Sequence, residues 1–232
     1  MSSLNGWLSE NKLTPNLAKS NYIVIPSTKN NTIDNLNIFL RGTRLQKVKK
    51  ATYLGVQLDE NLNWKEHIDS LCSKISPVVG VLSKVRWVLP ERICRLLYMS
   101  LIHCHLMYCL EVWGCASNLA LHPLEVIQKR IIRLMSFAPY QSHTAHLFES
   151  LEIMTVRKLY LYKICVLVQK EITGVTRTKH FNFNFVNHIY PTRSNCRRNL
   201  RIPSITSNIS NRALCCFKYI GPRCYNIFAS SS

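Results

Sequence analysis

Basic residues gather in two short stretches of this chain, and the chemistry they could perform is phosphate binding. One stretch lies between positions 41 and 50, and the other lies on a helix expected after Pro123. Exposed cations at such density neutralise phosphates and release their counterions. The alternatives are an edge strand kept soluble by its lysines for the first stretch and a solvated helix face for the second. For the first stretch the total charge favours phosphate contact, whereas the second stretch leaves both interpretations open. The eight candidates are Arg41, Arg44, Lys47, Lys49, Lys50, Lys129, Arg130 and Arg133.

Tyr53 and Gly55 stand beside the first basic stretch. A tyrosine ring can stack on a base or a sugar, and a glycine lets a ligand approach the backbone closely. The alternative is an ordinary core strand with Gly55 at a bulge. The sequence leaves both interpretations open.

Carboxylates that could hold catalytic metal ions are few. The only aspartates are Asp34, Asp59 and Asp69. Asp59 and Glu60 are adjacent, so on a strand their side chains would face opposite ways. Two-metal nucleotidyl transfer needs clustered carboxylates. We therefore expect no catalytic metal site in this chain.

Histidine and cysteine cluster in the most apolar segment, as His103-Cys104-His105 with Cys109 and Cys115. The paired cysteine spacing of zinc sites is missing, and adjacent Cys215 and Cys216 are poor joint ligands. Buried free cysteine is common. We therefore expect no bound metal.

The overall charge points to a polyanionic partner. Thirty Lys and Arg against twelve Asp and Glu give a formal charge of +18 over 232 residues. Such an excess favours nucleic acid first and an anionic membrane second, although a merely soluble basic protein also fits. No secretory leader is visible, and charged groups interrupt the apolar run from 93 to 113. We expect an intracellular protein, nuclear or cytoplasmic, with reduced thiols and no membrane span.

The expected fold class is α+β. β-Branched runs separated by turns predict a small antiparallel sheet of three or four strands. From Trp64 the apolar period becomes helical, with a kink or break at Pro77, a long helix from 91 to 113, one after Pro123 and one capped by Thr155. The expected domains are 1–63, a helical part 64–175, and a loosely ordered basic tail 176–232.

Several motifs carry a family resemblance. The segment Tyr53-Leu-Gly-Val-Gln-Leu-Asp59, then Leu62-Asn-Trp64 and His67-Ile68, resembles the block after the polymerase core in reverse transcriptases of non-LTR (LINE-type) retrotransposons. Other matching positions are Trp7, Asn11–Leu13, Lys19-Ser20, Leu106, Tyr108, Trp113-Gly114, Ile127-Gln-Lys129, Tyr190–Arg193, Leu200 and Tyr225-Asn226.

The resemblance implies specific roles. It makes Tyr53–Leu58 similar to a primer grip, Lys19 similar to a lysine beside the incoming triphosphate, and the helices similar to a thumb that holds an RNA–DNA duplex. The family's Asp-Asp box is absent, so we expect no cofactor in this chain, although Mg²⁺ serves the intact family. We expect a decayed copy or a partial reading frame. Alternatives are a basic helical nucleic-acid-binding protein, a part of a full polymerase, and a non-functional relic.

Overall fold

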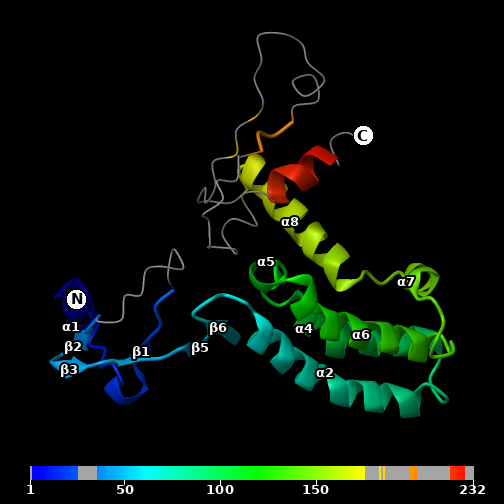
Figure 1. Cartoon of the computed structure of the whole chain (residues 1–232), viewed down its shortest axis with the longest axis horizontal. Coiled ribbons are helices and arrows are strands. Elements are labelled where there is room, and N and C mark those ends of the chain that lie inside the picture. The colour runs from blue at the N-terminus through cyan, green and yellow to red at the C-terminus, as the bar shows by residue number, and fades with distance from the viewer. Residues whose placement is uncertain are drawn as a thin grey trace, which may run out of the picture.

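The computed structural model describes residues 2–25, 36–175, 183, 185, 199–202 and 220–227. It confirms the expected α+β class, with short strands near the N-terminus and helices after them. Figure 1 shows the N-terminal helix and the first strands on one side of the molecule and the later helices on the other. The expected basic tail falls largely outside the described residues.

The N-terminal strands pair two by two, where we expected one sheet of three or four antiparallel strands. Each ladder is only two or four residues long, which leaves no shared edge for a wider sheet. β1 and β4 are parallel, and the other two pairs are antiparallel. In chain order the elements are α1 (Ser2–Glu10), the 3-10 turn η1 (Leu17–Lys19), β1 (Asn21–Tyr22), β2 (Phe39–Leu40), β3 (Thr43–Arg44), β4 (Gln46–Lys47), β5 (Lys50–Tyr53) and β6 (Val56–Asp59).

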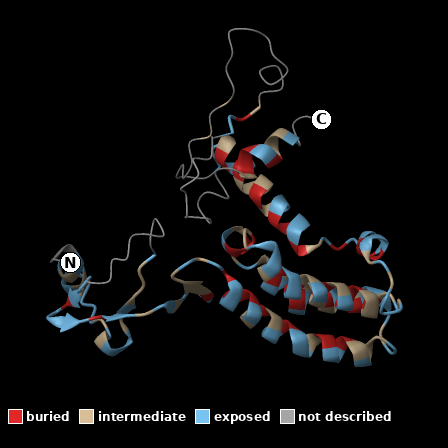
Figure 2. Ribbon diagram, in the orientation of Figure 1, coloured by how far each residue is buried: buried red, intermediate tan, exposed pale blue. Residues whose placement is uncertain are grey.

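Two long helices that run side by side in the same direction, α2 (Lys65–Val85) and α6 (Asn118–Met135), form the base of the helical body. Their buried side chains lie on facing sides, as Figure 2 shows, and include Ile68, Ile75 and Ile131. These residues recur at the three- and four-residue spacing that predicts an amphipathic helix.

Neither of the two helical prolines interrupts its helix, so the break considered at Pro77 and the helix start expected after Pro123 are both wrong. α2 runs unbroken through Pro77, and α6 begins at Asn118, before Pro123. Both prolines are exposed, so water can satisfy the carbonyl groups that they leave without a helical partner. The side chain of Ser117 caps α6 by accepting from the amide of Ala120 at 3.3 Å.

The long helix expected from 91 to 113 is broken into pieces. It consists of α3 (Glu91–Tyr98), a π-helical turn η2 (Met99–His103), α4 (Cys104–Met107) and α5 (Leu110–Trp113). Cys109 has a left-handed backbone, with φ of 49°. This break turns Trp113 into the core, where its indole Nε1 donates to the carbonyl of Tyr108 at 2.9 Å.

The remaining helices complete the core. α7 (Ala145–Ser150) and α8 (Val156–Ile172) follow α6, and residues 220–227 form a further helix next to α8. Thr155 caps α8 as predicted, because its hydroxyl accepts from the amide of Lys158. Within the described residues, no helix is both long and apolar enough to cross a membrane.

Candidate nucleic-acid interface

The β5–β6 hairpin carries the segment that resembles a primer grip. Its register pairs Lys50 with Asp59 and Tyr53 with Val56, joined by a two-residue turn. Both turn residues, Leu54 and Gly55, have positive φ, the conformation that suits hairpin strands and favours glycine. Tyr53 is 66% exposed and Leu54 71%, so Tyr53 is not a core residue and Gly55 sits in a turn, not at a bulge.

The hairpin tip is fastened to the helical body. The hydroxyl of Tyr108 donates to the carbonyl of Leu54, although the two residues are 54 positions apart. A Cβ added to Gly55 would lie 3.6 Å from the Tyr108 ring. The contact holds the backbone of the turn against the helices and leaves the Tyr53 ring facing solvent.

Asp59 holds the loop between β6 and α2. Its carboxylate accepts from the amides of Asn61 at 2.9 Å, Asn63 at 3.0 Å and Trp64 at 3.2 Å. Leu62 and Trp64 have left-handed backbones, each costing roughly 1–2 kcal/mol, which these charge-assisted bonds offset. Asp59 and Trp64, two positions of the resemblance, thus build a junction between β6 and α2, with Trp64 buried as its anchor.

His67 belongs to the same junction. Its Nδ1 accepts from the amide of Gln57 at 3.4 Å, and its ring lies 5.6 Å from that of Trp113. Burial, followed by the charge of Lys74, lowers the pKa of His67. The neutral imidazole is the form that can accept this bond.

The five cations between 41 and 50 are all exposed, but they belong to different elements. Arg41 lies in the turn between β2 and β3, Arg44 on β3 and Lys47 on β4. Lys49 precedes β5. Lys50 pairs with Glu66 of α2 across exposed surface.

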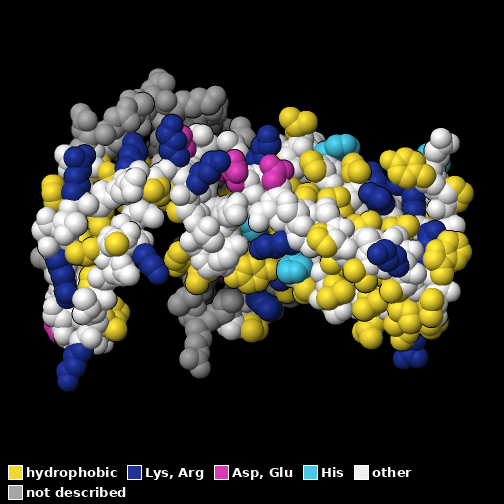
Figure 3. Space-filling view, turned by 90° about the horizontal axis from the view of Figure 1, so that it is seen from below, with side chains coloured by type: hydrophobic (Ala, Val, Ile, Leu, Met, Phe, Trp, Pro, Cys, Tyr) yellow, Lys and Arg dark blue, Asp and Glu magenta, His cyan; other side chains and the backbone are white. Residues whose placement is uncertain are grey.

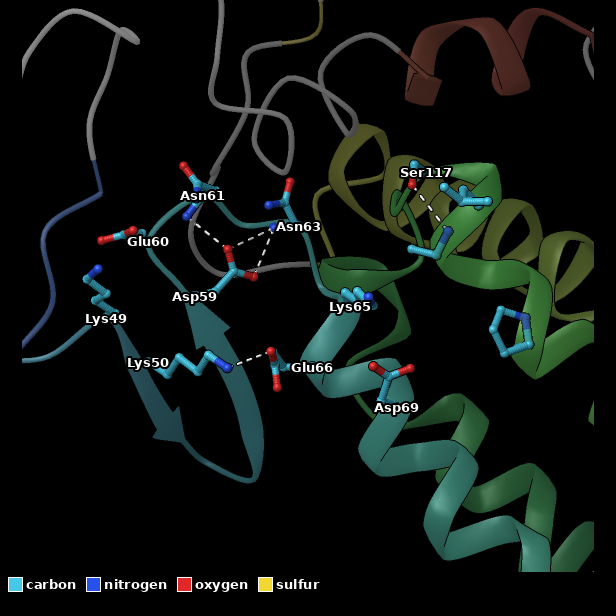
Figure 4. Close-up of a pocket in the computed structure, with 13 residues that line it drawn as sticks. Lys49, Lys50, Asp59, Glu60, Asn61, Asn63, Lys65, Glu66, Asp69 and Ser117 are labelled. Carbon is cyan, nitrogen blue, oxygen red and sulfur yellow. Dashed lines mark hydrogen bonds and ion pairs between the residues drawn. The ribbon is translucent and has the colours of Figure 1, made fainter.

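A cleft of about 590 Å³ lies where the end of the hairpin meets the first turns of α2 and α6. Figure 4 shows Lys49, Lys50 and Lys65 in its lining together with Glu60, Glu66 and Asp69. The mixture of charges makes it a poor phosphate channel by itself.

The cations of α6 are less uniformly exposed. Arg130 is exposed, whereas Lys129 and Arg133 are half-buried. Arg133 donates through Nε to the carbonyl of Ser142 at 3.0 Å, which ties down the segment after α6. That leaves Arg130 as the most accessible of the three.

Gln128 is a structural residue that the sequence analysis matched to the family without assigning it a role. It is buried, and its amide nitrogen donates at 2.9 Å to both the Tyr98 hydroxyl and the Met154 carbonyl. Its amide oxygen accepts from Val156 at 3.1 Å. Gln128 therefore joins α6 to α3 and to the start of α8.

Lys19 ends the 3-10 turn η1 and is exposed, two residues before β1. Since β1 pairs with β4, Lys19 lies on the same strand region as the basic residues of 41–50. Among the described residues, no group of three or more His, Cys, Asp or Glu could hold a metal ion. Cys109 follows the end of α4, so it does not share a continuous helix with His105.

Two distant positions of the family pattern meet in the structure. The side-chain amide of Asn226 accepts from the Leu200 amide at 2.7 Å and donates to the Leu200 carbonyl at 2.9 Å. Leu200 also forms an isolated bridge with Phe185. This pairing fixes a short part of the chain next to the helix at 220–227.

Comparison with known proteins finds relatives among mobile elements. Over 127 residues the chain is 25% identical to a probable RNA-directed DNA polymerase from transposon BS of Drosophila melanogaster, covering 52% of this chain and 14% of the relative. Over 113 residues it is 28% identical to the RNA-directed DNA polymerase from mobile element jockey of Drosophila funebris, covering 46% of this chain and 12% of the relative. The jockey polymerase of Drosophila melanogaster is 25% identical over 122 residues.

These matches confirm the resemblance to reverse transcriptases of non-LTR retrotransposons. About half of the chain is similar to RNA-directed DNA polymerases from mobile elements, and the matched part spans only 12 to 14% of those two relatives' length. No protein-family model and no solved structure matches the chain.

Proposed function

We propose that this chain holds primer–template nucleic acid, as a segment that follows the catalytic core of an RNA-directed DNA polymerase. The observation that carries the proposal is the β5–β6 hairpin. Its turn is anchored to the helices by Tyr108, while Tyr53 and Leu54 face solvent beside exposed cations. A rigid support with an exposed ring and nearby positive charge suits a strand end with its phosphates.

Arg44 and Lys49 are the cations we assign to the phosphates. Both are exposed and lie on either side of β4, close to the hairpin in the chain. Lys50 is a weaker candidate because it pairs with Glu66. Tyr53 is assigned a stacking contact with the last sugar or base of the primer.

Binding to matched substrates tests this proposal. Fluorescence anisotropy would compare an RNA–DNA hybrid that has a recessed 3′ end with a blunt hybrid of the same length. We expect tighter binding to the recessed hybrid and a selective loss of that preference in Tyr53→Ala. Tyr162→Ala is the matched control, since Tyr162 is an exposed tyrosine on α8. Equal affinity of the wild-type chain for both hybrids would contradict the primer-end assignment.

A further inference from the structure

The helical body ends in an exposed cluster of aromatic and arginine side chains, far from the hairpin. It is formed where α2 ends and where the chain leaves α6, and we call it the aromatic tip. Figure 3 shows hydrophobic side chains gathered with Lys and Arg at that end of the molecule. The aromatic tip consists of Arg86, Trp87, Val88, Arg133, Phe137 and Tyr140.

Its rings are ordered, not loose. The guanidinium of Arg86 lies 4.6 Å from the Trp87 ring centre and 5.1 Å from that of Phe137. Trp87 and Phe137 meet edge to face at 5.1 Å. Arg86 is itself fixed, because its Nη1 donates to the Leu134 carbonyl at 3.2 Å. Trp87 and Tyr140 nevertheless remain 71% and 79% exposed.

Phe137 occupies a position that favours glycine. α6 ends in a Schellman-type turn, in which the amide of Ala138 donates to the Arg133 carbonyl at 3.0 Å. Phe137 takes the left-handed residue of this turn, with φ of 52°. A bulky side chain is disfavoured there, yet it is half-exposed and adds little to the core. Strain of this kind is a reason to look for a function.

The local charge selects the partner. Between residues 126 and 148 the chain has Lys129, Arg130 and Arg133 and no acidic residue. An aromatic surface interleaved with arginine matches the π-faces of unpaired bases and their phosphates, whereas a purely apolar protein partner would leave these cations without compensation. Prior ordering of the rings also lowers the entropic cost of stacking.

We propose that the aromatic tip binds single-stranded nucleic acid, with unpaired bases stacked on Trp87 and Tyr140. The inference rests on the proposed function only in assigning nucleic acid as the partner, since this site lies apart from the hairpin and takes unpaired bases. It gives the chain a second contact, suited to template or product strand outside the duplex.

The test separates stacking from phosphate attraction. Anisotropy would measure the full chain with a labelled oligothymidylate and with an abasic strand of the same length, which keeps the phosphates and lacks the bases. Trp87→Ala with Tyr140→Ala should weaken binding of the oligothymidylate roughly tenfold or more and leave the abasic strand unchanged. Trp87→Phe with Tyr140→Phe should retain most of the affinity.

Trp7→Ala with Tyr162→Ala is the matched control, since it removes one exposed tryptophan and one exposed tyrosine elsewhere. Sedimentation of each variant checks self-association. The inference would be overturned if the Trp87→Ala with Tyr140→Ala variant lost the same affinity for both strands or lost none for either. It would also be overturned if the only change were from dimer to monomer. If the wild type binds RNA–DNA hybrid but the tip variant behaves as wild type, the proposed function stands alone. Failure of the wild type to bind any strand would overturn both.

Discussion

At the scale of single residues, a buried hydrogen-bonding role explains why Gln128 matches the pattern of the family. Gln128 uses both its amide nitrogen and its amide oxygen, and serves Tyr98 and Val156 at once. The same burial raises the pKa of Tyr98 to about 12, so its hydroxyl stays protonated at any physiological pH. Removing the Gln128 amide would leave its buried partners, the Tyr98 hydroxyl and the Val156 amide, without this hydrogen bond.

Gln128→Leu should therefore lower the free energy of unfolding by about 3 kcal/mol, since each buried polar group left unpaired costs roughly 1–3 kcal/mol. Denaturant unfolding would measure it. Gln169→Leu, at an exposed glutamine of α8, is the control and should change stability little. A stability loss below about 1 kcal/mol would show that Gln128 does not join the helices as described.

His67 makes stability depend on pH. Its pKa is lowered in the folded chain, so the unfolded chain binds a proton more readily, near its ordinary value of 6.5. Stability is then fully present above that value and declines as pH falls through it, by at most about 1.4 kcal/mol per pH unit from this residue.

Replacement of His67 by asparagine, whose side-chain oxygen can still accept from the Gln57 amide, should reduce the slope of stability against pH between neutral and mildly acidic pH; the lowered pKa of the half-buried His103 keeps part of that slope. Unfolding at several pH values would measure the slope. His122→Asn, at an exposed histidine, should leave the slope unchanged. An identical slope in His67→Asn and wild type would refute the assignment.

At the scale of elements, close packing between α5 and α8 depends on one glycine. A Cβ added to Gly114 would meet the Tyr160 ring at 2.4 Å and the Leu110 carbonyl oxygen at 2.6 Å. Gly114→Ala should destabilise the chain by about 1–3 kcal/mol through overpacking. Gly80→Ala, in open space on α2, should instead stabilise it by up to about 1 kcal/mol. Thermal unfolding of both variants gives the comparison, and equal effects would contradict the packing described.

The elements also show where sequence reasoning succeeds. The apolar period of α2 and the Thr155 cap of α8 are local signals, and both are confirmed. The break at Cys109 carries no Pro or Gly signal, because a non-glycine residue takes the left-handed conformation there. The two prolines that do signal a break lie on exposed helix faces, where the helix continues.

The candidate site was less accessible to sequence reasoning, because it depends on contacts between distant residues. The segment from Tyr53 to His67 was identified from its pattern, but its fastening by Tyr108 joins residues 54 positions apart. Likewise, no local pattern indicates that Glu66 pairs with Lys50 or that Arg86 aligns Trp87 and Phe137. Exposure and ion pairing decide which cations are available to contact phosphates, and the spacing of residues in the sequence predicts neither of them.

At the scale of the whole molecule, this 232-residue polypeptide should not extend a primer by itself. Asp59 is engaged with backbone amides, and Asp69 lies on α2 in the described structure. Nucleotidyl transfer requires clustered carboxylates that hold two metal ions. A primer-extension assay with Mg²⁺ or Mn²⁺ should show no incorporation above a no-protein control. Incorporation by a homogeneous preparation would sink this prediction.

The charge of the whole chain sets how binding should respond to salt. Each phosphate that is neutralised releases a condensed counterion. The logarithm of the affinity therefore falls linearly with the logarithm of the salt concentration, and the slope is proportional to the number of phosphate contacts. With a net charge of +18, several contacts are expected, and affinity should fall roughly a thousandfold or more between low and moderate salt.

The most direct test of phosphate binding is the dependence of affinity on salt in variants that lack positive charges, measured by fluorescence anisotropy with an RNA–DNA hybrid. Arg44→Gln with Lys49→Gln should weaken binding to all sequences alike and reduce the slope by about two contacts. Lys158→Gln with Lys170→Gln removes the same charge from exposed positions on α8, and should change the slope little. A smaller slope only in the first variant would support the account. An affinity that does not depend on salt, or equal slopes in the two variants, would contradict it.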